Sequence, residues 1–138
     1  MVGSLCEAYR EVARSGPAGH MVNLLFDHRT DGVEVESPYT HGELRVRVLR
    51  PGPLFVRVPP WVGPEELEVG AEGRHLRTGG YIFSPEPPTD RHVVLRFPLK
   101  EQEMCLSGHV HPIRVRGDEV VAMDNFGADL TFFENYEP

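Results

Sequence analysis

Two histidines near the C-terminal end of the sequence have the spacing of a metal-binding pair. His109 and His111 are separated by one residue, and such residues point to the same side of a strand, so their imidazoles could share one metal ion. A cupin-like β-barrel also needs a carboxylate a few residues later, but residues 112–116 hold none and Glu119 lies beyond a turn. With no third ligand in place, we expect two surface histidines. A small cupin-like metal-binding β-barrel is kept as the second alternative.

Aromatic side chains are the next candidates, because flat rings stack on sugars. Trp61, Tyr81 and Phe83 are the candidate ligand-binding residues. Tyr81 and Phe83 are two positions apart and therefore share one face of a strand. A core or a partner interface uses such a pair more often than a sugar does. A carbohydrate-binding module is therefore the first alternative, not the leading interpretation.

No constellation of residues indicates catalysis. Carboxylates such as Glu65, Glu66 and Glu68 are close in sequence, but glycoside hydrolysis needs two carboxyl groups about 5 to 10 Å apart across a sugar. The sequence has no G-x-S-x-G motif, and neither Cys6 nor Cys105 has the local signature of a nucleophile. No glycine-rich loop of the phosphate-binding type is present either. We therefore predict no catalytic residue and no cofactor, and expect the chain alone to be inactive.

Composition and charge limit the class of partner. The chain has 138 residues and a formal net charge of -7, which disfavours nucleic acid as a partner. No apolar stretch approaches the roughly 18 to 20 residues that span a bilayer, and Glu7 and Arg10 interrupt the region where a signal peptide would be apolar. We expect a soluble, cytoplasmic protein without a membrane partner. The two cysteines, far apart in sequence, are expected to be buried or idle thiols.

The first residues have the pattern of one short helix. Ser4 and Glu7 have the spacing of a capping box, and Gly16 and Pro17 would end the helix. One apolar stripe follows the helical period and consists of Leu5, Ala8, Tyr9 and Val12. Because a helix of this length is marginal alone, its stripe is expected to dock on another surface. The β core is expected to begin only after residue 21.

From residue 22 the apolar period changes to two, which is typical of antiparallel sheets with one buried face. The clearest runs are 33–36, 43–48, 54–58 and 93–97, and shorter runs occur at 67–69, 81–83, 113–115, 120–123 and 130–133. The breaks have turn chemistry, as at Pro51-Gly52-Pro53, Gly79-Gly80 and Gly117-Asp118. Arg116-Gly117-Asp118 is accordingly interpreted as a hairpin turn and not as an adhesion motif.

About nine or ten short strands at this spacing predict an all-β fold, an antiparallel β-sandwich of the jelly-roll kind, with one short N-terminal helix. We expect residues 1–20 to form the helix and a linker, and residues 21–138 to form the β-sandwich domain.

Several segments, taken in order, resemble one family of glycoside hydrolases. Residues 21–26 open the β region, and residues 54–61 have the pattern L-x-[VIL]-R-[IV]-P-x-W. Gly80-Tyr81-Ile82 and residues 93–98 follow the pattern G-Y-[LI] … L-x-F-P, and residues 114–123 look like a strand–turn–strand found near the end of some members. Together they resemble the β-L-arabinofuranosidase-like glycoside hydrolases of family 127. The R-[IV]-P-x-W segment is the most specific part.

The resemblance implies a β-sandwich that follows an α/α-barrel catalytic domain and packs against it. In that family the catalytic cysteine and the zinc-ligating Cys and Glu residues belong to the barrel, and their adjacent Cys-Cys motif has no counterpart here. Residues 1–16 would then be the end of the last barrel helix. The leading hypothesis is therefore a non-catalytic accessory module with a structural or interdomain role. Its partner would be an α/α-barrel domain or a second copy of the chain, and carbohydrate is a further candidate ligand.

Overall fold

The computed structural model describes residues 2–37, 42–70, 73–105, 112–117 and 119–123. The chain divides into two compact units, Met1–Pro98 and Leu99–Pro138. The described residues form one α-helix, one short 3-10 helix and thirteen strands. The all-β prediction with a single short N-terminal helix is therefore confirmed. Whether residues 21–138 fold as one domain stays a prediction.

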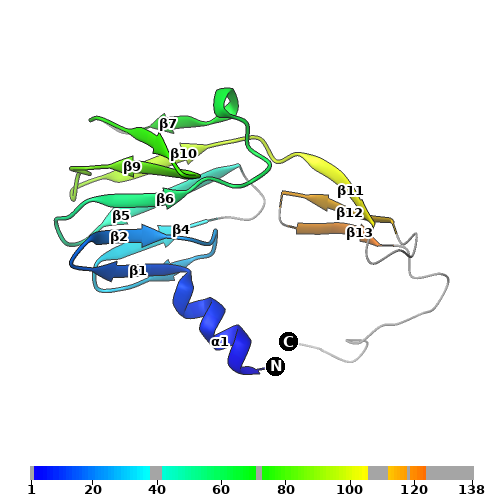
Figure 1. Cartoon of the computed structure of the whole chain (residues 1–138), viewed down its shortest axis with the longest axis horizontal. Coiled ribbons are helices and arrows are strands. Elements are labelled where there is room, and N and C mark those ends of the chain that lie inside the picture. Colours follow the sequence, from blue (N-terminus) through cyan, green and yellow to red (C-terminus); the bar gives the residue numbers. More distant parts are fainter. Residues whose placement is uncertain (1, 38–41, 71–72, 106–111, 118, 124–138) are drawn as a thin grey trace. The chain divides into compact units, whose positions relative to one another are not determined.

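Sheet A lies in the first unit (Figure 1). It holds, in spatial order, β1 (Ala13–Gly16), β2 (Gly19–Val22), β6 (Leu54–Arg57), β9 (Tyr81–Ser84) and β8 (Leu76–Thr78). Neighbouring strands are antiparallel except for β2 and β6, which run parallel with His20 beside Leu54. The antiparallel prediction thus holds for this sheet with one exception.

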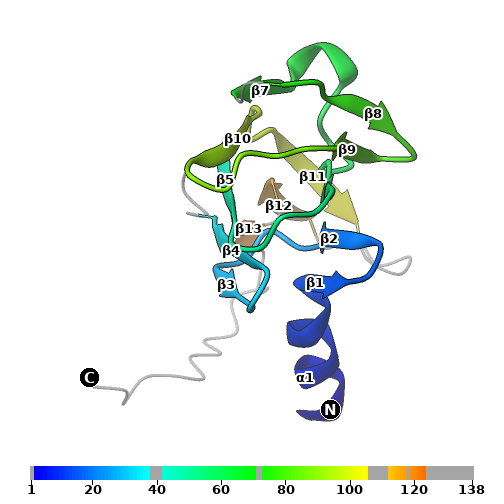
Figure 2. The ribbon, with the colours of Figure 1, turned by 90° about the vertical axis from the view of Figure 1, so that its left-hand side faces the viewer.

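Sheet B forms the second layer of the same unit, and Figure 2 shows the two sheets facing each other. It holds, in spatial order, β3 (His28–Arg29), β4 (Val33–Glu36), β5 (Glu43–Val48), β10 (His92–Arg96) and β7 (Glu68–Gly70). All its strand pairs are antiparallel. The two sheets make the predicted sandwich.

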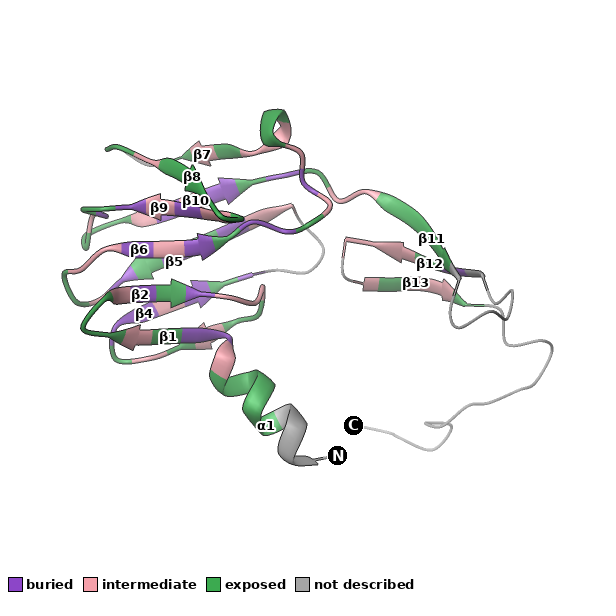
Figure 3. Cartoon of the chain, in the orientation of Figure 1, coloured by how far each residue is buried: buried purple, intermediate pink, exposed green. Residues whose placement is uncertain are grey.

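The core lies between the inward faces of sheets A and B, as the alternating burial in Figure 3 shows. Leu44 and Leu95 of sheet B have no exposed surface, and Leu54 and Val56 of sheet A are each 1% exposed. Burial of one such side chain stabilises the fold by about 1.5–3 kcal/mol relative to exposure. The period-two pattern of the sequence therefore predicted the buried faces correctly.

The connection through Pro51-Gly52-Pro53 joins the two sheets. It leaves β5 in sheet B and enters β6 in sheet A, so it is a crossover and not a hairpin within one sheet. The glycine pair Gly79-Gly80, in contrast, does make a hairpin between β8 and β9, and both glycines have positive φ angles, of 54° and 80°. Glycine adopts this conformation without the steric strain that a side chain adds.

Helix α1 (Val2–Glu11) begins before Ser4, so this serine lies inside the helix and does not cap it. The helix ends at Glu11 and not at the predicted stop, Gly16, because strand β1 already begins at Ala13. Val12, between the two elements, is buried with 1% of its surface exposed. Tyr9, in contrast, is 61% exposed, and its ring makes a T-shaped contact with the His28 ring. The predicted apolar stripe is therefore divided between the core and the exterior, while the side chain of Leu5 lies outside the described part. Figure 1 shows the helix leaving the sheets at the start of β1.

The second unit contains sheet C, with β11 (Glu101–Cys105), β12 (Pro112–Arg116) and β13 (Glu119–Met123) paired antiparallel in this order. Gly117 has a φ of 64°, which agrees with the predicted hairpin turn, although Asp118 is outside the described residues. The predicted run at 130–133 also lies outside them. Among the described residues, α1 is the longest helix, and none could span a membrane.

Candidate functional site

The outward face of sheet B carries several charged side chains that pair with one another. The Glu43 carboxylate accepts hydrogen bonds from Arg45 at 2.6 Å and from Arg96 at 2.8 Å. Arg29 pairs with Glu34 at 3.0 Å. Exposed ion pairs of this kind contribute only about 0–1 kcal/mol each to stability. This face is therefore suited to contact with water.

The two guanidinium groups also lower the pKa of Glu43. The hydrogen bond from Arg45 is the largest cause, that from Arg96 is the next, and together they hold the pKa below its ordinary value of 4.5. A glycosidase acid needs the opposite change, a carboxyl pKa raised toward neutrality by an apolar environment. Glu43 is thus a structural ion-pair partner and not a catalytic acid.

The outward face of sheet A carries a row of apolar side chains that crosses four strands. Met21 on β2 lies beside Phe55 on β6, which is opposite Phe83 on β9. Phe83 is in turn opposite Leu76 on β8. We call these four residues the outer ridge. Met21 is 39% and Leu76 is 44% exposed. An exposed contiguous apolar row marks an interaction surface more often than a single exposed residue does.

The rings of the outer ridge stack on each other and not outward. Phe55 and Phe83 have ring centroids 4.7 Å apart and planes inclined by 28°, so one face of Phe83 is already covered by Phe55. A sugar platform needs an open ring face. The ridge is therefore better suited to pack against an apolar protein surface than to stack on a sugar.

Tyr81, the second predicted ligand-binding residue, holds the end of helix α1. Its hydroxyl donates to Asn23 Oδ1 at 3.0 Å, and Asn23 Nδ2 donates to the Glu11 carbonyl at 3.1 Å. That carbonyl belongs to the last residue of α1, where helix carbonyls lack a partner within the helix. Tyr81 therefore anchors the helix through Asn23, and its hydroxyl is already engaged.

Arg57 lies next to the outer ridge on the same outward face. It is opposite Tyr81 in the pairing of β6 with β9 and is exposed. Among the described residues no carboxylate forms an ion pair with it. A surface that covers the outer ridge would therefore meet an unpaired positive charge beside it.

Trp61, the remaining predicted ligand-binding residue, is separate from the outer ridge. It is half-buried in the loop after β6, and its indole Nε1 is buried without a hydrogen-bond partner in the described part of the chain. No ring contact joins it to Tyr81 or Phe83 among the described residues. The structure thus brings Tyr81 and Phe83 onto one face, as predicted, but does not bring Trp61 into a common platform with them.

The predicted metal pair cannot be placed, because His109 and His111 lie outside the described residues. Within the part that the structure describes, no three or more His, Cys, Asp or Glu side chains converge as metal ligands would. Cys6 is a free, exposed thiol and not a buried one, whereas the Cys105 side chain is outside the described part. The idea of a metal site at the two histidines stays a prediction.

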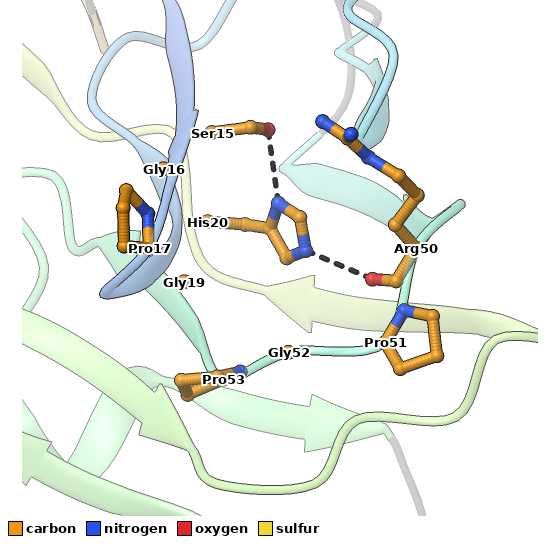
Figure 4. A pocket seen from close by; sticks show the side chains of 9 residues that line it. All are labelled: Ser15, Gly16, Pro17, Gly19, His20, Arg50, Pro51, Gly52 and Pro53. Atoms are coloured by element: carbon orange, nitrogen blue, oxygen red, sulfur yellow. Dashed lines mark hydrogen bonds between the residues drawn. The ribbon is translucent and has the colours of Figure 1, made fainter.

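A cavity of about 370 Å³ lies between two loops at one end of the sandwich (Figure 4). Its walls come from the β1–β2 turn and from the crossover between β5 and β6, and the lining residues are Ser15, Gly16, Pro17, Gly19, His20, Arg50, Pro51, Gly52 and Pro53. His20, only 4% exposed, points between the two loops. Its Nδ1 lies 2.9 Å from Ser15 Oγ and its Nε2 lies 2.8 Å from the Arg50 carbonyl oxygen.

Glycines make room for this histidine. A Cβ on Gly32 would come within 2.2 Å of Ser15 Oγ and 2.7 Å of His20 Nδ1. A Cβ on Gly52 would approach His20 Nε2 to 3.2 Å. The first distance is shorter than any non-bonded contact tolerates, so the pair of polar side chains depends on glycine at position 32.

Sequence reasoning missed Ser15 and His20. Both lie in the range 1–20, which was interpreted as a helix and linker, whereas they occupy facing positions on β1 and β2. The signal that could have located them is Gly16-Pro17-Ala18-Gly19, a turn-forming sequence between two short segments. A strand of four residues with one buried side chain gives too little alternation to be recognised.

The β-sandwich is similar in fold to part of a solved glycoside hydrolase structure. A solved structure described as a glycoside hydrolase is 19% identical, with a TM-score of 0.55 over 83% of this chain and 23% of that chain. A β-L-arabinofuranosidase of family 127 from Geobacillus stearothermophilus T6 is 20% identical, with a TM-score of 0.48 over 78% of this chain and 20% of that chain.

The predicted likeness to a region of glycoside hydrolases is thus confirmed at the level of the fold. This chain spans less than a quarter of the length of the solved chains that it matches. No protein-family model and no curated protein matches the sequence.

Proposed function

We propose that this chain is an accessory β-sandwich module of a glycoside hydrolase-like protein, with a structural or interdomain role and no glycosidase activity of its own. The contrast between the two outward faces of the sandwich carries the proposal. The outward face of sheet B bears ion pairs, whereas the outward face of sheet A exposes the apolar side chains of the outer ridge. A module with water on both sides would gain no stability from these exposed apolar side chains.

The proposed partner is the α/α-barrel domain of such a protein, packed on the outer ridge. Two features support this partner over a second copy of the chain. Helix α1 is held at the edge of the same sheet by Asn23 and Tyr81 but is exposed over residues 6–10, so a helical neighbour would cover it. In a symmetric pair formed through the ridge, the contact would contain Arg57 of both copies, and like charges in a contact are repulsive, so self-association of the isolated chain should be weaker than packing on a partner domain. A partner with a carboxylate opposite Arg57 avoids this repulsion.

The first experiment tests activity. The chain should hydrolyse no aryl arabinofuranoside or other aryl glycoside above the rate of a heat-denatured control. The support for this expectation is that Glu43, a carboxyl with a lowered pKa, is shifted away from the range of a catalytic acid. Turnover that is abolished by substitution of a single carboxylate or cysteine would refute the accessory role.

The second experiment separates the interdomain role from a carbohydrate-binding module. Light scattering at increasing concentration should show association through the exposed ridge, and Phe83→Ser should reduce it while Val94→Thr on the outward face of sheet B should not. A glycan array should show no binding. A monomeric protein that binds a glycan with micromolar affinity, lost in Trp61→Ala, would favour the carbohydrate-binding alternative.

Metal analysis tests the remaining alternative. We expect no stoichiometric zinc, iron, manganese or nickel in the purified protein. A tightly held metal that is lost in His111→Ala would instead support a metal site at His109 and His111.

The cytoplasmic location likewise stays a proposal, to be tested by fractionation of cells that express the full protein.

A further inference from the structure

The cavity between the β1–β2 turn and the crossover holds a serine and a histidine that the proposed interdomain role does not use. Ser15 and His20 are directly opposite each other on β1 and β2, with both side chains on the inward face. Ser15 Oγ and His20 Nδ1 are 2.9 Å apart. The cavity is lined by both residues and lies away from the outer ridge, which is on the outward face of sheet A.

The hydrogen-bond partners fix which nitrogen of the neutral imidazole carries the proton. The Arg50 carbonyl oxygen, 2.8 Å from His20 Nε2, can only accept a hydrogen bond. Nε2 must therefore carry the hydrogen, and Nδ1 has the free lone pair. The Ser15 hydroxyl then donates to Nδ1. This order of a hydroxyl, a base and a group that orients the base is the arrangement that activates nucleophilic serines.

We propose that Ser15 is an acyl-accepting nucleophile, with His20 as its general base and the Arg50 carbonyl as the group that orients His20. Ser15 Oγ attacks the carbonyl carbon of an activated ester, and its proton passes to His20 Nδ1. The bond between that carbon and the leaving oxygen then breaks, and the leaving oxygen takes the proton back from Nδ1. The products are an O-acyl serine and an alcohol, so atoms and charge balance. This inference goes beyond the proposed function, because it concerns modification of the cavity and not the covering of the ridge.

The imidazole keeps its partners throughout this step. When Nδ1 is protonated, Nε2 still donates to the Arg50 carbonyl, so no donor or acceptor is left unpaired. On its other side the serine is bounded by Thr30, whose Oγ1 lies 3.4 Å from Ser15 Oγ and donates its own hydrogen to the Val33 carbonyl oxygen. Gly32 forms a close wall behind both side chains, since any Cβ there would meet Ser15 Oγ at 2.2 Å. The serine is therefore held in one position relative to its base.

The cavity also indicates the class of acyl group. Its volume of about 370 Å³ is near the lower end of the range for small-molecule sites. Pro17, Pro51 and Pro53 supply apolar walls, and Arg50 pairs its guanidinium with Asp31 at 2.7 Å. Because Arg50, the cation among the described lining residues, is already paired, a short uncharged acyl group such as acetyl fits better than an anionic one.

The test uses p-nitrophenyl acetate and the intact 138-residue chain. We expect mass spectrometry of the whole protein to show uptake of one acetyl group, and peptide mapping to locate it on Ser15. Ser15→Ala should abolish this uptake. Ser84→Ala, which removes another inward serine of sheet A that is 3% exposed, should leave it unchanged. His20→Gln should slow acetylation by about 100-fold or more, the typical contribution of a general base.

Two results would overturn the inference. One is no acetylation of Ser15 under conditions that label a known serine hydrolase. The other is equal acetylation of wild type and Ser15→Ala, which would place the label on another group such as Lys100. Circular dichroism checks the fold of each variant, and Ser15→Ala decides the outcome if His20→Gln does not fold. Continued release of p-nitrophenol that disappears in Ser15→Ala would support the inference and show that the acyl-serine is also hydrolysed.

Discussion

Phe55 and Phe83 lie directly opposite each other on β6 and β9, and their rings stack with centroids 4.7 Å apart. Both point away from the core, because the residues on either side of each, such as Leu54 and Ile82, are the buried ones. The pair therefore forms the centre of the outer ridge and contributes both to the sheet and to whatever covers it. These two roles can be separated by substitution.

Phe83→Ser should reduce association strongly and stability only moderately. The loss of an aromatic cross-strand pair removes about 0.5–1.5 kcal/mol beyond the lost buried area, while most of the ring is outside the core. Urea denaturation measures the stability change, and sedimentation velocity measures association. The control Val94→Thr lies on the outward face of sheet B. Unfolding of Phe83→Ser in buffer would show that the ridge belongs to the core.

Gly32→Ala should destabilise the fold by about 1–3 kcal/mol, because the added methyl overpacks a filled site. The methyl would meet Ser15 Oγ at 2.2 Å. The same substitution in a Ser15→Ala background should therefore have a smaller effect. Gly16→Ala is the matched control, since nothing lies within 4 Å of a Cβ there, and its effect should stay within about 0.5 kcal/mol. Equal urea midpoints for Gly32→Ala and Gly16→Ala would contradict the packing seen around His20.

Glu43 should make stability depend on pH in the acid range. Its pKa in the folded state is lowered below 4.5 by Arg45 and Arg96. Because the folded-state pKa is lowered, the stabilisation by Glu43 is fully present above the pKa of the unfolded state. It is lost as the pH falls through the pKa of the folded state. Glu43→Gln should therefore reduce stability near neutral pH and flatten its decline below about pH 4.5. Denaturation midpoints from pH 7 down to pH 3 test this, with Glu65→Gln as the control.

Two truncations should behave differently. Removal of residues 1–10 takes away most of α1, in which residues 6–10 are exposed, and should leave the β core folded. Removal of residues 1–16 also deletes Val12 and Ala13, which are 1% and 4% exposed, together with strand β1. Loss of a buried aliphatic side chain alone destabilises by about 2–5 kcal/mol. The sequence pattern placed the start of the core after residue 21, so equal urea midpoints for the two truncations would favour that earlier prediction.

The sequence predicted those parts of the fold in which a regular pattern is long enough to detect. Residues 43–48 alternate three buried and three outward side chains, and this strand was predicted without error. The strands β1 and β2 have four residues each, too few to separate from the helix before them. The sheet to which a strand belongs was also undetermined, because Pro51-Gly52-Pro53 can equally join strands of one sheet or of two.

The candidate surfaces were predictable to a lesser degree. The alternation of side chains along a strand was enough to place Tyr81 and Phe83 on one face. It could not supply the rest of the outer ridge, because Phe55 and Met21 come from strands far earlier in the sequence and strand register is a property of the fold. The Ser15–His20 pair was missed for the same reason. Its orienting group is a backbone carbonyl, which carries no sequence signal at all.

The parallel pairing of β2 with β6 has a consequence for how the chain folds. Residues 20–22 can join sheet A only when residues 54–56 are in place, and the segment between them builds the opposite sheet. The pairing of β2 with β6 therefore closes a long loop. Such loops slow folding, because the conformational entropy of the chain between the strands is lost before the contacts between them form. The N-terminal hairpin, with helix α1 attached, should add to the nascent sandwich late and detach from it early. Amide hydrogens of β1 and β2 would then exchange with solvent faster than those of β5 and β10, although all four strands contribute buried residues to one core.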